Sequence, residues 1–172
     1  LADNAKKEID SFQPDYIMMS YHGLPLKHLS KIHNVCEGSE CCLTVSDKNK
    51  NCYRHQAFQT SFALAKELDL NPDQYEVAFQ SRLGPGWIQP FTDVRLEELA
   101  KKGIKKVLVL SPSFVVDCLE TLEEIGIRAN EDFKKWGGEE VRLVPSLNSS
   151  DKWVKALGEI YSADNLWSEK LV

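Results

Sequence analysis

The sequence predicts an α/β protein built on a doubly wound, four-stranded parallel sheet with helices on both faces. Its 172 residues, 42% of them hydrophobic, suffice for the core of one domain but not for two domains of ordinary size. Four short apolar runs alternate with segments of helical periodicity, an order that requires right-handed crossovers between parallel strands. The runs are continuously apolar rather than alternating, as expected for strands that are covered on both faces.

The four expected strands are short and are bounded by turn residues. They are the runs at residues 16–20, 75–80, 106–110 and 141–144. The first follows the Pro14-Asp15 turn, and the third is dense in β-branched and aliphatic residues and stops at Ser111-Pro112. Both features are typical of buried strands that end at a loop.

Apolar residues recur with a helical period between these strands. The clearest stripe runs from Arg54 to Leu68, and a shorter helix is expected from Thr92 to Lys102, before Gly103. The longest helix is expected from Asp117 to Trp136, and the last from Ser149 to Tyr161. Together they complete the alternation of strand and helix.

The start of the chain predicts a domain excised from a longer polypeptide. The first residue is Leu1 rather than Met, and residues 2–9 read like the last turns of a helix. We therefore expect residues 1–172 to be a single domain with a cysteine-rich insert at about residues 27–52. The missing amino-terminal half would supply the other wall of any cleft.

Charge and hydropathy exclude several classes of protein. The formal net charge is −5 and there is no long basic run, so we expect no nucleic-acid partner. The chain contains no apolar run long enough to cross a membrane and no amino-terminal secretory signal. These features predict a soluble, cytoplasmic protein and leave a peripheral membrane contact open.

Polar groups follow each expected strand. They are His22, Ser81-Arg82, residues 113–117 and residues 146–148. Ligands of doubly wound sheets bind beyond the carboxyl ends of the strands. The sequence therefore predicts that all four groups line one rim.

His22 lies in Ser20-Tyr21-His22-Gly23-Leu24-Pro25, at the end of the first expected strand. An imidazole can act there as a base or as a metal ligand at neutral pH. Gly23 and Pro25 would turn the chain sharply and leave the ring facing the rim. A histidine that only bonds its own loop is the alternative, and position alone gives the two readings similar weight.

Three carboxylates open the longest expected helix. Asp117, Glu120 and Glu124 are spaced i, i+3 and i+7, so a regular helix would place them on one face. An acidic first turn that is favoured by the helix dipole is the ordinary explanation. Because the helix starts on the same rim as His22, we favour a carboxylate track that binds a divalent cation and strips its water.

Trp87 follows the Gly84-Pro85-Gly86 turn. Its ring could pack on a planar ligand or simply cover the core of the domain. Taken alone, this motif favours the core.

Four of the five cysteines (Cys36, Cys41, Cys42 and Cys52) crowd into one irregular segment. Without a secretory signal, such crowding favours metal or cluster ligation over disulfides. Four thiolates suit a [2Fe–2S] cluster, whereas the spacing fits the cysteine pairs of zinc sites poorly. Adjacent Cys41 and Cys42 make a two-disulfide scheme awkward. The cluster is the leading prediction, zinc and reduced or disulfide-bonded thiols remain open, and Cys118 is expected to stand apart.

Several motifs together resemble the ferrochelatase family, in its order and spacing. They are Ser-Tyr-His-Gly-Leu-Pro at 20–25, Phe-Gln-Ser-Arg-Leu-Gly-Pro at 79–85, Trp87 with Thr92-Asp93, residues 114–125, and the segment from Glu140 to Asn148. The resemblance covers nearly the whole chain, but only the carboxyl-terminal half of the usual enzyme. It implies a Rossmann-like half of a class II chelatase-like fold.

The resemblance also implies a reaction, the insertion of ferrous iron, as substrate, into a porphyrin to make haem. It gives His22 the role of removing pyrrole protons, and it makes Glu120 the essential glutamate opposite. Asp117 and Glu124 match further carboxylates of an iron track. The family's second histidine is here Cys118, and a further carboxylate found in some members is here Arg128. These two departures make the outer end of the track less certain than the inner end.

The resemblance further implies the ligands and partners of the domain. We expect protoporphyrin IX as the porphyrin, and the missing amino-terminal ferrochelatase domain as the partner. The residues expected to contact porphyrin are Tyr21, Gln80, Ser81 and Trp87. Some family members carry a [2Fe–2S] cluster, which the cysteine insert would hold here. A chelatase for another tetrapyrrole and a non-catalytic iron–sulfur protein remain the alternative functions.

Overall fold

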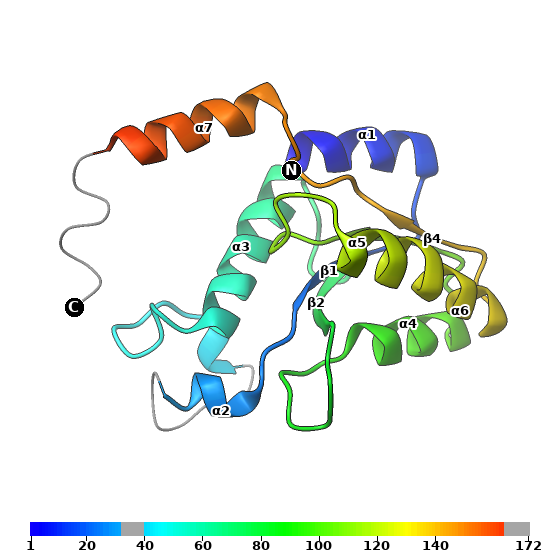
Figure 1. The fold of residues 1–172 in the computed structure, drawn as a ribbon. Coiled ribbons are helices and arrows are strands. Elements are labelled where there is room, and N and C mark those ends of the chain that lie inside the picture. The colour runs from blue at the N-terminus through cyan, green and yellow to red at the C-terminus, as the bar shows by residue number, and fades with distance from the viewer. Residues whose placement is uncertain (32–39, 164–172) are drawn as a thin grey trace.

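The computed structural model describes residues 1–31 and 40–163 and contains one parallel sheet (Figure 1). Its strands lie in the order β2-β1-β3-β4. They are β1 (Tyr16–His22), β2 (Tyr75–Gln80), β3 (Lys106–Leu110) and β4 (Glu140–Leu143). The predicted α/β class and four-stranded parallel sheet are therefore confirmed, and two of the four strands have the expected bounds.

Helices cover both faces of the sheet, as a doubly wound fold requires. The helical elements are α1 (Ala2–Phe12), α2 (Leu26–Leu29), η1 (Glu40–Cys42), α3 (Tyr53–Glu67), α4 (Thr92–Lys101), α5 (Leu119–Thr121), η2 (Leu122–Ala129), α6 (Asn130–Lys135) and α7 (Asp151–Ser162). On one face, α4, η2 and α6 pack over the sheet through fully buried Leu96, Ile125 and Phe133. On the other face, α1 and α3 bury Phe12 and Ala65.

β1 is two residues longer than expected, and this extension places His22 within the sheet. His22 pairs with Gln80 on β2. On the other side, the pairing of β1 with β3 stops at Met19 and Leu110. The last three residues of β1 therefore have a strand neighbour on one side only.

The helix expected from Asp117 to Trp136 differs from the prediction in two ways. It begins at Leu119, so Asp117 precedes it, and its central part, η2, is a π-helix rather than an α-helix. A π-helix has more residues per turn and is often found at functional sites. Because Asp117 precedes the helix, the spacing i, i+3, i+7 does not place Asp117 on one helix face with Glu120 and Glu124.

The last helix, α7, has an apolar stripe but no buried residue. Figure 1 shows it extending away from the sheet beside the start of α1, where Lys152 pairs with Asp3 at 2.5 Å. None of the helices in the described parts of the chain is long and apolar enough to span a membrane. The expected cytoplasmic location and any peripheral membrane contact stay predictions.

Candidate active site

His22 closes β1 with both of its main-chain groups bonded to side chains. Its N–H donates to Ser113 Oγ at 3.0 Å, and its carbonyl accepts from the Tyr53 hydroxyl at 2.7 Å. Ser113 follows β3 and Tyr53 begins α3, so two other elements meet β1 at this point. The predicted position of His22 on the rim thus has a defined local structure.

The ring of His22 is oriented by the next peptide. Nδ1 lies 2.6 Å from the carbonyl oxygen of Gly23. Because a carbonyl oxygen only accepts hydrogen bonds, we assign the proton of the neutral imidazole to Nδ1. Nε2 then carries the free lone pair and can accept a proton or bind a cation. His22 does bond its own loop, as the alternative supposed, but this bond leaves the reactive nitrogen free.

Two aromatic side chains flank the imidazole. The ring centroid of Trp87 lies 6.5 Å away and that of Phe114 lies 5.9 Å away, both tilted by about 45°. Trp87 is only half-buried, and it is joined to Pro25 by an isolated bridge. Trp87 therefore lies beside His22 and is partly rather than fully buried.

Gly23 allows this close arrangement. A Cβ atom at Gly23 would lie 2.9 Å from the main-chain oxygen of Gln80 and 3.4 Å from the Trp87 ring. The Gly23 N–H also donates to that oxygen at 2.7 Å. Any larger residue would push β1 away from β2 at the point where His22 is presented.

A porphyrin contact would require Gln80 to be exposed at the rim, but the structure buries this residue. Its side chain is 2% exposed and accepts a hydrogen bond from Ser20 Oγ at 2.7 Å. Its amide nitrogen donates to the main-chain oxygen of Glu120 at 2.5 Å. Gln80 therefore joins the sheet to the start of the helix that carries Glu120. The expected contact of Gln80 with porphyrin is corrected, because its side chain is buried.

Glu120 is held as a carboxylate near His22. The Cys118 side chain and the amide of Glu120 itself donate hydrogen bonds that lower the pKa of the Glu120 carboxyl, and nearby His22 adds to this effect. The first residues of a helix also favour negative charge. At neutral pH the site therefore offers an ionised carboxylate beside an imidazole.

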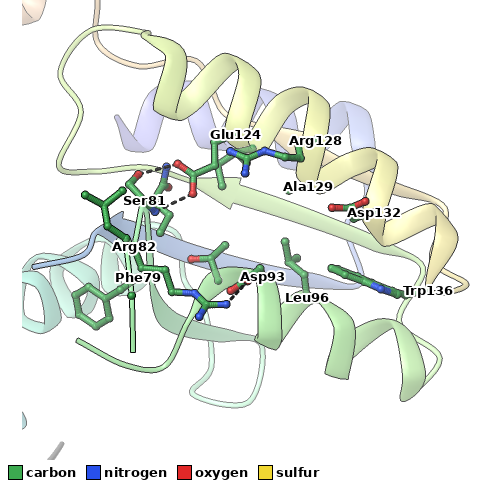
Figure 2. A pocket seen from close by; sticks show the side chains of 15 residues that line it. Phe79, Ser81, Arg82, Asp93, Leu96, Glu124, Arg128, Ala129, Asp132 and Trp136 are labelled. Atoms are coloured by element: carbon green, nitrogen blue, oxygen red, sulfur yellow. Dashed lines mark hydrogen bonds and ion pairs between the residues drawn. The ribbon is translucent and has the colours of Figure 1, made fainter. Parts of the chain in front are cut away.

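Glu124 lies one turn further along and is bonded to the end of β2. Its two carboxylate oxygens accept from the main-chain N–H and the hydroxyl of Ser81, each at 2.7 Å (Figure 2). Ser81 has φ 60°, a left-handed conformation that is unusual for a residue other than glycine. The structure thus makes partners of Ser81, which was expected to contact porphyrin, and Glu124, which was expected on the carboxylate track.

Asp117 is tied to the loop after β4 rather than aligned with Glu120. Its carboxylate accepts from Ser146 N–H at 3.0 Å and from Asn148 Nδ2 at 2.8 Å. Partial burial opposes ionisation, but these hydrogen bonds outweigh it and lower the pKa of the Asp117 carboxyl. Both oxygens thus join the loops after β3 and β4, and a place for Asp117 on an iron track stays a prediction.

Tyr21 points into the core, contrary to the expectation of a porphyrin contact. It is 3% exposed, and its hydroxyl bonds Ser61 of α3 at 2.8 Å. Successive side chains of a strand face opposite sides of the sheet, so the residue next to His22 lies on the other face. Because side chains alternate in this way, the expected contact of Tyr21 with porphyrin is corrected.

A cavity of about 400 Å³ is lined in part by the Ser81–Glu124 pair (Figure 2). Its lining does not include His22. Ion pairs lie at its edge, among them Arg82 with Asp93 at 2.5 Å. The cavity adjoins the candidate site through shared residues but is separate from the imidazole.

The described part of the cysteine segment is an ordered loop on α3. Asn49 is buried and donates from Nδ2 to the main-chain oxygens of Cys41 and Thr44, at 2.5 and 2.8 Å. His55 and Gln59 of α3 bond the Cys42 carbonyl, each at 3.1 Å. The insert is therefore anchored at several main-chain groups.

Two of the thiols in this loop are buried. Cys42 and Cys52 are 0% and 1% exposed, and burial, with Cys41 and Cys52 nearby, raises the pKa of the Cys42 thiol to about 12. Cys36 lies outside the described residues. Within residues 1–31 and 40–163, no group of three or more histidine, cysteine, aspartate or glutamate side chains is arranged to hold a metal ion.

Tyr53 and Phe114 are site residues that were not predicted from the sequence. Tyr53 lies directly after the cysteine segment, and Phe114 was visible only as part of a longer motif. Both reach His22 from elements distant in the chain. No local pattern indicates such contacts, although Phe114 falls in a strand-end loop that was expected on the rim.

Comparison with known proteins gives consistent matches. Residues 1–164 match the family model named Ferrochelatase. Proteins named ferrochelatase share 52% identity over 158 residues in Coxiella burnetii, strain Dugway 5J108-111, and 51% over 146 residues in Legionella pneumophila, strain Corby. A third, from Pseudomonas fluorescens, strain ATCC BAA-477 / NRRL B-23932 / Pf-5, shares 48% over 151 residues. These alignments cover 84% to 90% of this chain but only 44% to 45% of each relative.

Proposed function

The chain belongs to the ferrochelatase family, and on that premise we propose that it forms one wall of a site where ferrous iron is inserted into a porphyrin, with protoporphyrin IX as the macrocycle. It spans less than half the length of the relatives that it matches. The proposed reaction therefore belongs to the full-length enzyme, a lyase. The amino-terminal half of that enzyme is the proposed partner of this domain.

The reaction sets two requirements that the site can meet. A porphyrin must lose two pyrrole N–H protons as its four nitrogens bind Fe²⁺, and the hydrated ion must lose its water. His22 Nε2, with its free lone pair, is the proposed acceptor of these protons one at a time, and it would pass the first to solvent before it takes the second. The ionised Glu120 carboxylate is the proposed ligand that replaces water on the ferrous ion. Trp87 and Phe114 would give the flat macrocycle aromatic contacts on either side of the imidazole.

The observation that carries the proposal is the juxtaposition of an imidazole whose Nε2 is free and an ionised carboxylate. Gly23 O fixes the tautomer of His22, and the Cys118 side chain donates a hydrogen bond that lowers the pKa of Glu120. A site that moves protons and binds a dication needs both groups at the same pH. Glu124 and Asp117 contribute by bonding the surrounding loops rather than by facing the ion.

The decisive variants of the full-length enzyme are His22→Ala and Glu120→Gln. Each should reduce metal insertion by at least about a hundredfold, because each removes a group that acts on the reacting atoms. The measurement is the loss of the porphyrin Soret and Q bands on addition of Fe²⁺. Glu123→Gln, on the exposed side of the helix where Glu123 pairs with Arg128, is the matched control. Near-normal turnover by either His22→Ala or Glu120→Gln would contradict the assignment.

For the cysteine insert we propose a [2Fe–2S] cluster held by Cys36, Cys41, Cys42 and Cys52. The supporting observations are the burial of Cys42 and Cys52 and the proximity of Cys41 to the Cys42 thiol. A thiol with a raised pKa is protonated at neutral pH, so the cluster must displace protons to bind. Its proposed role is to fasten a long loop.

An absorbance and iron analysis of anaerobically purified full-length enzyme tests the cluster. We expect visible charge-transfer bands and two iron atoms per chain, both lost in Cys42→Ser. Cys118→Ser is the control, because Cys118 lies at the start of α5 rather than in the insert. Colourless protein that contains one zinc per chain would favour a zinc site, and metal-free protein would favour plain thiols or disulfides.

A further inference from the structure

The peptide that carries His22 lacks a strand partner on one side. β1 continues to His22 beside β2, but its pairing with β3 ends at Met19. The N–H and C=O of one strand residue point to the same side, so those of His22 face the position that β3 leaves open. Unpaired main-chain groups in a partly buried site are costly and leave the chain end poorly fixed.

Two hydroxyl groups occupy the place of the missing strand. Ser113 Oγ accepts from the His22 N–H, and Tyr53 donates from its phenol to the His22 carbonyl. Both main-chain groups of His22 are thus satisfied by side chains that belong to other elements.

The Tyr53 bond extends to the imidazole through a single peptide unit, while Ser113 fixes the N–H of the preceding peptide. The His22–Gly23 peptide is held by Tyr53 at its carbonyl and by the Gln80 carbonyl at its N–H. The next carbonyl, that of Gly23, lies 2.6 Å from Nδ1 of the ring. A rotation of this peptide would move the Gly23 carbonyl and release the ring from the tautomer that leaves Nε2 free.

We propose that Tyr53 and Ser113 form a hydroxyl clamp that positions the His22 imidazole as a proton acceptor. The clamp acts through the main chain and touches neither porphyrin nor iron. The inference rests on the proposed function of His22, and it assigns a task to two residues that this function does not otherwise use. Removal of either hydroxyl should weaken the proton-transfer step more than the binding of substrates.

Kinetic tests use Tyr53→Phe and Ser113→Ala in the full-length enzyme. We expect kcat to fall roughly ten- to a hundredfold, because small misplacements of reacting groups have effects of that size. The KM values for porphyrin and iron should stay within about twofold. Tyr75→Phe is the matched control, since Tyr75 is a partly buried tyrosine at the opposite end of the sheet. Unchanged kcat in both clamp variants would overturn the proposal.

A spectroscopic test separates positioning from general damage to the fold. The ring nitrogens of His22, assigned by comparison with His22→Ala, should show one tautomer in the parent enzyme and a mixture in Tyr53→Phe. If kcat falls while the tautomer stays unchanged, the clamp is overturned. If Tyr53→Phe does not fold, Ser113→Ala alone decides, because Ser113 is exposed. An active His22→Ala would instead refute the proposed function, and the tautomer measurement would still decide the geometry of the clamp.

Discussion

At the scale of residues, hydrogen bonds to His22 and Glu120 control which atoms of the site can accept a proton or bind a cation. His22 presents a free Nε2 because Nδ1 is bonded to a carbonyl, and hydrogen bonds to Glu120 lower the pKa of its carboxyl. The tautomer and the lowered pKa do not follow from residue type alone. Each depends on an atom within hydrogen-bonding distance, and each can therefore be changed by a single substitution.

The Cys118→Ala substitution should shift the acidic limb of the activity profile to higher pH. The Cys118 side chain is the largest contributor to the lowered pKa of Glu120, so its removal raises that pKa toward the ordinary value. Glu120 must be ionised to bind the cation. With a higher pKa, its carboxylate takes up a proton at a higher pH as the solution is acidified, and activity falls there. The measurement is kcat/KM for iron as a function of pH in the full-length enzyme.

Cys118→Ser is the matched control for this shift. A serine hydroxyl can still donate to Glu120, so the acidic limb should stay near that of the parent. If Cys118→Ala leaves the limb in place, either Glu120 does not control it or the thiol does not stabilise the carboxylate. The thiol would then be a simple helix cap, a role that the capping box between Cys118 and Thr121 also supports.

At the scale of elements, the cysteine loop depends on one buried amide. Asn49 accepts from the Ser46 N–H at 2.8 Å and donates to two main-chain oxygens of the loop. Asn49 is 4% exposed, so truncation of its side chain would leave these groups without partners in a buried place. The stability lost in such cases is typically about 1–3 kcal/mol.

Asn49→Ala should therefore open the loop and expose Cys42 to thiol reagents. The reaction needs the thiolate, and the pKa of about 12 keeps the folded thiol protonated, so Cys42 reacts only when the loop opens. A loss of about 1.4 kcal/mol in local stability corresponds to roughly tenfold faster labelling. The measurement is the labelling rate at pH 8 after removal of bound metal. Asn51→Ala, at an exposed neighbour, is the control, and equal rates in both variants would contradict this role of Asn49.

The helix that carries the carboxylates shows how the shape of an element changes its function. A regular α-helix from Asp117 would align three carboxylates, but the observed helix starts later and becomes a π-helix at Leu122. Glu124 is bonded to Ser81 at the end of β2, and Asp117 is bonded to the loop after β4. Of the three, only Glu120 remains beside His22.

At the scale of the whole molecule, large apolar side chains are exposed close to the candidate site. Leu119 and Leu122 are 77% and 52% exposed on the helix that carries Glu120, and Val116 just before it is 55% exposed. Apolar patches of this kind commonly mark an interface. We interpret them as surface that the amino-terminal half of the full-length enzyme covers.

The isolated chain should consequently bind iron or porphyrin weakly and insert no metal. Catalysis requires the macrocycle and the ion to be held in register, and one wall of the site cannot hold both. Insertion by residues 1–172 should fall below detection under conditions where the full-length enzyme is active. The optical assay for porphyrin consumption measures insertion by the isolated chain and by the full-length enzyme. Circular dichroism of the isolated chain provides the control for folding.

Turnover by the folded, isolated chain at a rate near that of the full-length enzyme would contradict this prediction. It would mean that the site described here is sufficient without a second wall. Co-expression of the two halves as separate chains offers a further measurement. Recovery of activity on mixing would support the proposed partner, and failure of both halves to associate would count against it.

The sequence alone determined the sheet, the order of its elements and the general position of the site. Apolar runs and helical periods depend on local chemistry, so the strand at 106–110 could be predicted to the residue, and strand-end rules placed His22 on the rim. The tertiary structure decided which rim residues face one another. It buried Tyr21 and Gln80, moved Trp87 beside the imidazole, and brought Tyr53 to His22. These outcomes depend on packing between segments that are far apart in the chain, and a local pattern carries no information about such distances.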